Sequence, residues 1–449
     1  MKKREEKDIA SHDKDITSKI SSVKKILKAL GPGIITGASD DDPSTIATFS
    51  QAGAQFGFGM LWLALFQYPM KTVIQEICAR IGLVSGKGLS SAIKKRYSKN
   101  IVLPLTILLI IANTVNIGAD IAAMSASIRL VFPHFPVIAA ALSFTAFIIL
   151  SEVFVTYGKY VKILKYLTIS LFAYIATAII VGGNWNQILV ATIIPHIEFT
   201  PAFAMMFVAM FGTAISPYLF FWQASEEAEE EVEKHKIKEI GKGKPKISKK
   251  DIRLMREDTA VGMAFSQIIM WAIITTTAGS LHTHGITDIQ SADQAAKALE
   301  PLLKTFPQAG EISKTIFALG IIGTGLLAVP VLAGSSAYAL SDVFGWNEGL
   351  SKTFMQAKGF YLVIAASTLI GLWMNFTNID PIKALVYAAV INGVIAVPIL
   401  FAVMKIANDK KSLRDKTNNR MSNVIGWITF AIMGVSVIIL LVAWVTSNK

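Results

Sequence analysis

The chain has 449 residues, of which 53% are hydrophobic and only 16% are charged, and its mean hydropathy is +0.52. A soluble domain has about 25% charged residues, so the composition excludes a soluble globular protein and predicts an integral membrane protein. The single cysteine, Cys78, excludes an internal disulfide framework and a thiolate metal cluster.

Apolar stretches long enough to cross a bilayer, which takes about 20 residues, recur along the whole chain. They predict eleven membrane-spanning helices and leave no room for a separate soluble domain. A polar tail at residues 1–24 precedes them and lacks the pattern of a cleavable signal peptide. The predicted spans are residues 25–54, 57–84, 101–127, 135–155, 161–183, 199–232, 259–281, 313–341, 355–375, 382–406 and 423–446.

The formal net charge of +12 comes from basic residues that gather in alternate loops. The loops after the second, fourth, sixth and tenth spans are rich in Lys and Arg, whereas those after the first, fifth and ninth carry almost none. Because Lys and Arg in short loops stay on the cytoplasmic side, we expect a cytoplasmic N-terminus and an extracellular C-terminus in the plasma membrane. The charge therefore indicates topology and does not predict a nucleic-acid partner.

The first span contains the run Asp40-Asp41-Asp42-Pro43-Ser44-Thr45 between small and apolar residues. One ionised carboxylate at bilayer depth costs roughly 3 kcal/mol. Three of them beside a helix-breaking proline are tolerated only where the backbone lines a polar cavity enclosed by protein. The run predicts a site that holds a cation.

The sixth span contains a second interruption, Gly212-Thr213-Ala214-Ile215-Ser216-Pro217-Tyr218. In both spans a side-chain acceptor, Asp42 or Ser216, directly precedes a proline, which is typical of a helix N-cap followed by the first helical residue. Each span is thus predicted to be two half-helices joined by unwound backbone, although Pro217 alone is equally compatible with a structural kink.

Broken helices at corresponding positions of two halves indicate a transporter site between inverted repeats. The repeats would be residues 25–183 and 199–406, with residues 423–446 as an added last span. The half-helices that end near Gly37 and Thr213 leave backbone carbonyls free to face a cation, and Asp42 would supply the charge.

At these residues the chain resembles the Nramp family of divalent-metal transporters. The similarity is sharpest over residues 42–48 and 51–54, where the family carries Asp-Pro-Gly-Asn followed by similar residues, and again over residues 281–285 and 298–303. The resemblance implies an all-α, LeuT-type 5+5 inverted repeat with eleven transmembrane helices. It also implies unwound helices 1 and 6 with a metal site between them.

The departures from the family motif bear on the choice of metal. The family site uses the Asp and Asn of the span 1 motif, with a backbone carbonyl and a Met thioether from span 6. At these positions the chain has Asp42, Thr45, Thr213 and Ser216, so the soft sulfur ligand is absent. Oxygen donors suit Mg²⁺, Ca²⁺ and Mn²⁺, and Mg²⁺ usually keeps several waters. We therefore expect Mg²⁺ first and Mn²⁺ second as the imported substrate, and no resident cofactor.

Proton coupling is also expected to be lost. Family members that co-transport protons have a His after the span 6 proline and acidic residues on span 3, where this chain has Tyr218, Asn113 and Asn116. Tyr and Asn do not exchange protons near neutral pH, which resembles the Nramp-related magnesium transporter branch. Asp120 shares a helical face with both asparagines and either restores a proton path or bonds to neighbouring helices.

Other polar residues inside or next to the spans have two interpretations each. Asp40 and Asp41 either support the site and attract hydrated cations or are solvated in a vestibule. Asn392 either contacts a hydrated ion or bonds between helices. The acidic residues from Glu226 to Glu233 are expected to form a solvated face.

Three alternatives to an uncoupled Mg²⁺ importer stay open. They are a proton-coupled Mn²⁺/Fe²⁺ symporter of the same family, an organic-solute carrier on the same fold, and a membrane sensor that binds a cation without moving it. An enzyme is not expected, because no acid–base or nucleophile set lies within the spans. The expected partners are the metal ion and the lipid bilayer, and no protein partner is indicated.

Overall fold

The computed structural model describes residues 32–154, 167–181, 184–243, 245–303, 308–376 and 380–447. The predicted tail at residues 1–24, residues 25–31 of the first predicted span, and residues 161–166 and 182–183 of the fifth lie outside this part of the chain. Within it, regular structure is helical apart from one isolated bridge between Glu239 and Lys242. The predicted all-α class is confirmed.

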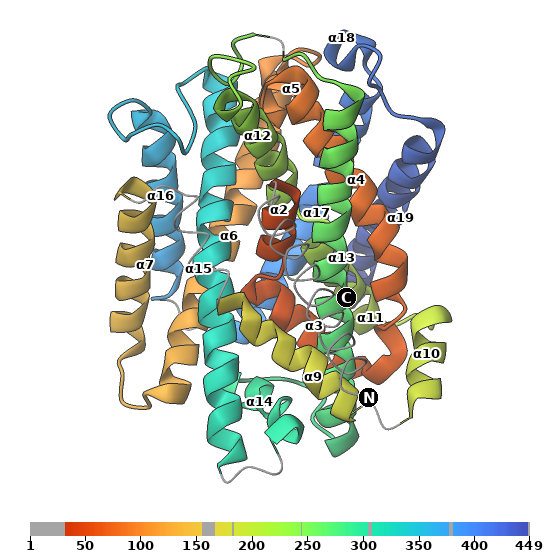
Figure 1. The fold of residues 1–449 in the computed structure, drawn as a ribbon. Coiled ribbons are helices and arrows are strands. Elements are labelled where there is room, and N and C mark those ends of the chain that lie inside the picture. The colour runs from red at the N-terminus through yellow and green to blue at the C-terminus, as the bar shows by residue number, and fades with distance from the viewer. Residues whose placement is uncertain are drawn as a thin grey trace, which may run out of the picture.

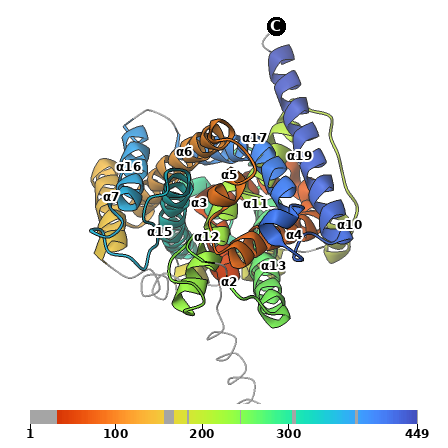
Figure 2. The ribbon, with the colours of Figure 1, turned by 90° about the horizontal axis from the view of Figure 1, so that it is seen from above.

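The long helices form one bundle, in which α3, α11 and α12 lie toward the middle (Figures 1 and 2). The helices of that bundle are α2 (Pro32–Asp40), α3 (Pro43–Phe56), α4 (Leu63–Ser85), α6 (Lys99–Val131), α7 (Val137–Phe154), α9 (Phe172–Val181), α11 (Pro201–Ala214), α12 (Pro217–Glu233), α13 (Lys249–Ser280), α15 (Ala309–Phe344), α16 (Lys358–Met374), α17 (Pro381–Ala407) and α19 (Arg420–Ser447). Short helices connect them: η1 (Gly57–Met60), α5 (Leu89–Lys94), η2 (Leu167–Leu171), α10 (Trp185–Ile193), η3 (His282–His284), α14 (Ala292–Lys297), η4 (Glu300–Leu303) and α18 (Lys410–Leu413).

Seven helices in the described residues are long and apolar enough to cross a membrane, or eight if a bent pair that includes α9 and α10 forms one span. Three other predicted spans correspond to helices that are broken, carry charged residues or are short. The first is broken into α2 and α3, α4 carries Lys71, Glu76 and Arg80, and α16 has only 17 residues. The number of eleven spans therefore stays a prediction.

Both predicted interruptions are present in the structure. Helix α2 ends at Asp40 and α3 begins at Pro43, with Asp42 as an N-cap whose side chain accepts from the Thr45 N–H. Helix α11 ends at Ala214 and α12 begins at Pro217. Ser216 has the extended backbone of an N-cap, but its side chain makes no capping hydrogen bond. The capping prediction is thus right for Asp42 and wrong for the Ser216 side chain.

The two half-helices that lead into the interruptions lie unusually close to their neighbours. A Cβ on Gly37 of α2 would lie 2.3 Å from the Gly262 carbonyl oxygen of α13, and a Cβ on Gly212 of α11 would lie 2.0 Å from the Ala389 carbonyl oxygen of α17. Small residues permit such close approach between membrane helices. Both interruptions are consequently held against long scaffold helices.

The acidic run at the end of α12 is not the solvated face that was expected. Glu227, Glu229 and Glu231 are buried. Glu229 accepts hydrogen bonds from the Ser351 N–H at 2.7 Å, the Leu350 N–H at 3.2 Å and the Tyr338 hydroxyl. A carboxylate that accepts several donors is stable without water, so Glu229 ties the loop after α15 to α12.

Candidate cation site

Asp42 is the buried carboxylate at the start of α3. Its Oδ1 accepts from the Thr45 N–H and the Ser44 hydroxyl, both at 2.7 Å, and its Oδ2 accepts from Asn116 Nδ2 of α6 at 3.0 Å. These donors and the positive end of the α3 dipole favour the ionised form. The side chain is therefore fixed in one orientation at the interruption, as a metal ligand requires.

Hydroxyl groups satisfy the carbonyls at the end of α2. Thr45 Oγ1 donates to the Asp40 carbonyl oxygen at 2.8 Å, and the Tyr218 hydroxyl donates to the Ser39 carbonyl oxygen at 3.1 Å. The last carbonyls of a helix have no partner inside it, and each oxygen can accept more than one bond. Because Tyr218 lies in the first turn of α12, its bond joins the two interruptions.

The interruption between α11 and α12 is closed in a similar way. The Ser216 hydroxyl donates to the carbonyl oxygens of Gly212 at 2.6 Å and Thr213 at 2.7 Å. The Thr213 hydroxyl donates to the Met210 carbonyl oxygen at 3.1 Å. The lone pairs of the Ser216 oxygen and of the Thr213 carbonyl are the oxygen donors that this interruption offers to a cation.

Asp40 and Asp41 face a different neighbourhood from Asp42. The Lys71 ammonium of α4 lies 2.5 Å from Asp40 Oδ2, and Lys71 and Asp40 are only 2% and 1% exposed. Ser266 of α13 donates to Asp40 Oδ2 at 2.5 Å, lies 3.0 Å from Asp41 Oδ1, and accepts from Lys71 at 2.9 Å. Neither carboxylate is solvated, so the vestibule interpretation is wrong.

The three residues of α6 that the sequence analysis singled out have separate roles. Asn116 bonds directly to Asp42, whereas Asn113 donates to the Leu332 carbonyl and the Ser336 hydroxyl of α15, at 3.0 and 2.9 Å. Asn113 therefore joins α6 to α15 and does not bond to Asp42. Asp120 is fully buried and lies within electrostatic range of Asp42.

Asn392 of α17 is buried beside the second interruption, since the adjacent Gly393 packs against Gly212. Its amide oxygen and nitrogen have no hydrogen-bond partner among the described residues. Burying an unpaired amide is costly. Asn392 is consequently available to a ligand or a water at the site, and no interhelical hydrogen bond of its side chain is seen in the described part of the chain.

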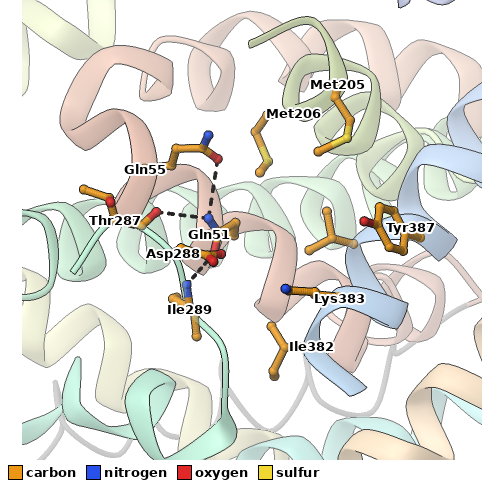
Figure 3. A pocket seen from close by; sticks show the side chains of 11 residues that line it. Gln51, Gln55, Met205, Met206, Thr287, Asp288, Ile289, Ile382, Lys383 and Tyr387 are labelled. Atoms are coloured by element: carbon orange, nitrogen blue, oxygen red, sulfur yellow. Dashed lines mark hydrogen bonds between the residues drawn. The ribbon is translucent and has the colours of Figure 1, made fainter. Parts of the chain in front are cut away.

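A cavity of about 290 Å³ lies near the outer ends of α3, α11 and α17 (Figure 3). Gln51 crosses it and holds the loop beyond α13, donating to the Thr287 carbonyl at 3.2 Å and accepting from the Ile289 N–H at 2.9 Å. At 1.5 Å per residue, Gln51, Met206 and Val386 each lie about 10 Å along their helices from Thr45, Thr213 and Asn392. The cavity therefore lies on the three helices that also carry Thr45, Thr213 and Asn392, about two turns away from them.

No group of three or more His, Cys, Asp or Glu side chains in the described ranges is arranged to hold a metal ion. The three consecutive aspartates do not converge, because Asp40 and Asp41 approach Ser266 while Asp42 approaches Asn116. A cation at the interruptions would be bound by one carboxylate together with carbonyl, hydroxyl and amide oxygens and water. This donor set suits hard divalent ions.

Sequence reasoning did not find Lys71 or Ser266. An ionisable residue inside a predicted span is by itself a sign of a functional role, so Lys71 could have been singled out within residues 57–84. Ser266 carries no such sign, because serine is common in membrane helices.

Comparison with known proteins bears on the whole chain. The family model described as natural resistance-associated macrophage protein-like, or Nramp, matches residues 33–443. A divalent metal cation transporter MntH from Caldanaerobacter subterraneus is 24% identical over 418 residues, with 90% of each chain covered. One of the same name from Klebsiella pneumoniae is 25% identical over 414 residues, covering 91% of this chain and 92% of the relative.

Solved structures share the fold at lower identity. A variant of the manganese transporter from Eremococcus coleocola has a TM-score of 0.73 and 16% identity, covering 92% of this chain and 86% of that one. A nucleobase-cation-symport-1 family transporter has a TM-score of 0.55 and 11% identity, with 93% of both chains covered. The predicted inverted-repeat transporter fold is thereby confirmed.

Proposed function

Since the chain belongs to the Nramp family, we propose that it is a membrane transporter of divalent metal cations that works by alternating access. The names of its relatives, divalent metal cation transporter and manganese transporter, support this class. The observation that carries the proposal is the buried Asp42 carboxylate, held by donors from Ser44, Thr45 and Asn116 where two helices are interrupted side by side.

We propose Asp42, Thr45, Thr213 and Ser216 as the metal-binding residues, with Thr213 contributing its carbonyl oxygen. Asn116 positions Asp42, and Asn392 offers an unpaired amide beside the interruption between α11 and α12. Tyr218 holds the end of α2. The halves that move in this scheme are α2 and α11, within repeats proposed to span residues 25–183 and 199–406.

The substrate we propose is Mg²⁺, with Mn²⁺ as the second choice. Ser216 supplies a hydroxyl where the family resemblance places a thioether, and a site without that sulfur loses its preference for soft metals. Mg²⁺ needs one or two carboxylates and keeps water ligands, which agrees with one fixed carboxylate among neutral oxygens. An organic anion is disfavoured by the aspartates.

We propose further that metal entry is not coupled to protons and that the basic loops face the cytoplasm. The Tyr218 hydroxyl is engaged with Ser39, and Asn113 and Asn116 cannot titrate. The second candidate function is a proton-coupled Mn²⁺ symporter. Asp120 favours it, because a buried carboxylate lies within electrostatic range of Asp42.

Transport in proteoliposomes tests the site and the metal together. Vesicles containing the protein are given Mg²⁺, Mn²⁺, Ca²⁺ or Cd²⁺, alone and in competition, beside vesicles containing Asp42→Ala. We expect Mg²⁺ and Mn²⁺ uptake that Asp42→Ala abolishes, with weak Cd²⁺ uptake. Strong Cd²⁺ transport would contradict the oxygen-only site, and full uptake by Asp42→Ala would contradict the ligand assignment.

A further inference from the structure

A cavity of about 400 Å³ lies at the end of the bundle that carries the basic loops, away from the two interruptions. It is formed by the end of α4, the start of α13 and the loop before α19. Five of its nine lining residues are basic, namely Arg80, Lys249, Arg253, Arg256 and Lys416, whereas only Glu257 and Asp415 are acidic. The cavity is therefore a pocket of positive charge.

Ion pairs within the pocket leave part of this charge uncompensated. Arg253 is paired with Glu257 and Lys416 with Asp415, both at 2.7 Å. Arg80 and Arg256 share one carboxylate, that of Glu76, at 3.1 and 2.8 Å. Lys249 makes no ion pair with any described residue. It is also the first residue of α13, where a basic group opposes the helix dipole and an anion is favoured.

One wall of the pocket is formed by a buried side chain, Arg80, and not by surface residues alone. Arg80 is 2% exposed, and its Nη1 donates to the Lys416 carbonyl at 2.7 Å while its Nη2 donates to Asn418 Oδ1 at 2.5 Å. These bonds fix the loop before α19, which forms the third side of the pocket. A buried guanidinium therefore sets both the shape and the charge of the cavity.

An apolar groove follows the same two helices into the membrane. Helices α4 and α13 lie side by side (Figures 1 and 2). Between them is a second cavity of about 270 Å³, whose lining includes Leu65, Tyr68, Ala264, Ile268 and Trp271. From Arg256 to Ile268 the helix rises about 18 Å, close to the roughly 15 Å thickness of one hydrocarbon leaflet.

An exposed apolar side of α13 lies along the helix between the two cavities. Leu254, Val261 and Ile268 recur every seven residues and are 52%, 55% and 53% exposed, so they form one outward stripe. A ligand with an anionic head and a long apolar tail matches a basic pocket and an apolar cavity that lie along the same two helices.

We propose that this site binds an anionic phospholipid of the adjacent leaflet, with its phosphate in the basic pocket and an acyl chain in the groove. In the proposed orientation this is the cytoplasmic leaflet, where anionic lipids and basic pockets between helices meet. The lipid would join α4 to α13, the helices whose Lys71 and Ser266 hold Asp40.

Lipid retention on the purified full-length protein tests the proposal. The protein is exchanged into detergent micelles containing phosphatidylglycerol or phosphatidylcholine, and bound lipid is counted by native mass spectrometry. We expect one retained phosphatidylglycerol and no retained phosphatidylcholine. Lys249→Gln should weaken retention about fivefold, because one uncompensated basic residue contributes about 1 kcal/mol.

Two further variants separate this site from general surface charge and from a soluble anion. Lys410→Gln with Lys411→Gln removes two exposed charges of α18 at the same end and should leave retention unchanged. Ala264→Phe, which fills the groove and keeps every charge, should weaken retention of the lipid.

Equal loss in the Lys410 and Lys411 variant, or no preference between the two lipids, would overturn the proposal. So would inorganic phosphate that displaces the lipid at millimolar concentration, or undiminished retention by Ala264→Phe.

Discussion

The three aspartates of the first interruption are neighbours in sequence but have different partners in space. Asp42 is fixed by Asn116 and by its own helix N-terminus, whereas Asp40 is bound to Lys71 and Ser266. A buried carboxylate needs a compensating charge or several donors. Lys71 supplies that charge to Asp40, whereas Asp42 has only neutral donors, so a cation at the interruption can supply its counter-charge.

The identity of residue 216 should set the preference among metals. Ser216→Met would return a thioether to the second interruption, and thioether sulfur favours softer ions. We expect the ratio of Cd²⁺ to Mg²⁺ uptake to rise about tenfold, the effect of roughly 1.4 kcal/mol of ligand preference. Ser216→Ala, assayed in the same proteoliposomes, controls for loss of the hydroxyl. An unchanged ratio in Ser216→Met would place this residue outside the metal's reach.

Replacing Lys71 should lower the stability of the folded protein. Lys71→Met leaves Asp40 buried without its partner, and breaking a buried pair in this way costs about 3–5 kcal/mol. We expect a lower melting temperature in detergent. Lys71→Met combined with Asp40→Asn should recover most of the loss, because neither charge then remains. If the double variant is as unstable as Lys71→Met, the pair is not the source of the effect.

At the scale of elements, the two interruptions are closed by the same device. The last carbonyls of α2 and α11 accept from hydroxyls of the segments that follow, and Tyr218 joins one interruption to the other. Gly37 and Gly212 seat these half-helices against α13 and α17. Movement of α2 or α11 during transport would have to break these hydroxyl bonds, which are weak enough, at about 1 kcal/mol each, to be exchanged.

The loop after α15 should make stability depend on pH. Burial raises the pKa of Glu348 well above its usual range, and the carboxylates of Asp342 and Glu229 raise it further. When the pKa of an acid is higher in the folded chain than in the unfolded chain, the folded state becomes less stable as the pH rises above the unfolded-state pKa.

Glu348→Gln should therefore raise the melting temperature at pH 8 and leave it nearly unchanged near pH 4, where the carboxyl is protonated in both states. Thermal unfolding at the two pH values measures this. Glu239→Gln, at a surface carboxylate whose pKa is lowered by its pairing with Lys242, is the control and should show no gain at pH 8. A lower melting temperature for Glu348→Gln at pH 8 would show that the charged form stabilises the loop.

At the scale of the whole molecule, the described residues place the outer cavity, the two interruptions and the basic pocket at different depths of one bundle. The outer cavity is covered by the loop that Gln51 holds, and its helices α3, α11 and α17 lead to the interruptions. Toward the opposite end, Glu229 holds the loop after α15. Each end thus has a loop fixed by one polar side chain, which suits a carrier that opens to one side at a time.

Coupling to protons is a property of the whole transport cycle and can be measured directly. We expect metal uptake into proteoliposomes without acidification of a pH-sensitive dye inside, because Tyr218 and the two asparagines of α6 do not exchange protons. Asp120→Asn should leave this result unchanged. Acidification that accompanies the metal and disappears in Asp120→Asn would establish the symporter instead.

The sequence by itself determined the membrane class, the helical fold and the positions of both interruptions. Each of these follows from local chemistry: apolar runs of spanning length, and an acceptor followed by proline. Only the tertiary structure decided what each polar side chain faces. Asp40 meets Lys71 and Ser266, which lie 31 and 226 residues away in sequence, and Glu229 is buried where its neighbours suggested solvent. Periodicity fixes which side of a helix a residue occupies, but partners so distant in sequence are chosen by packing.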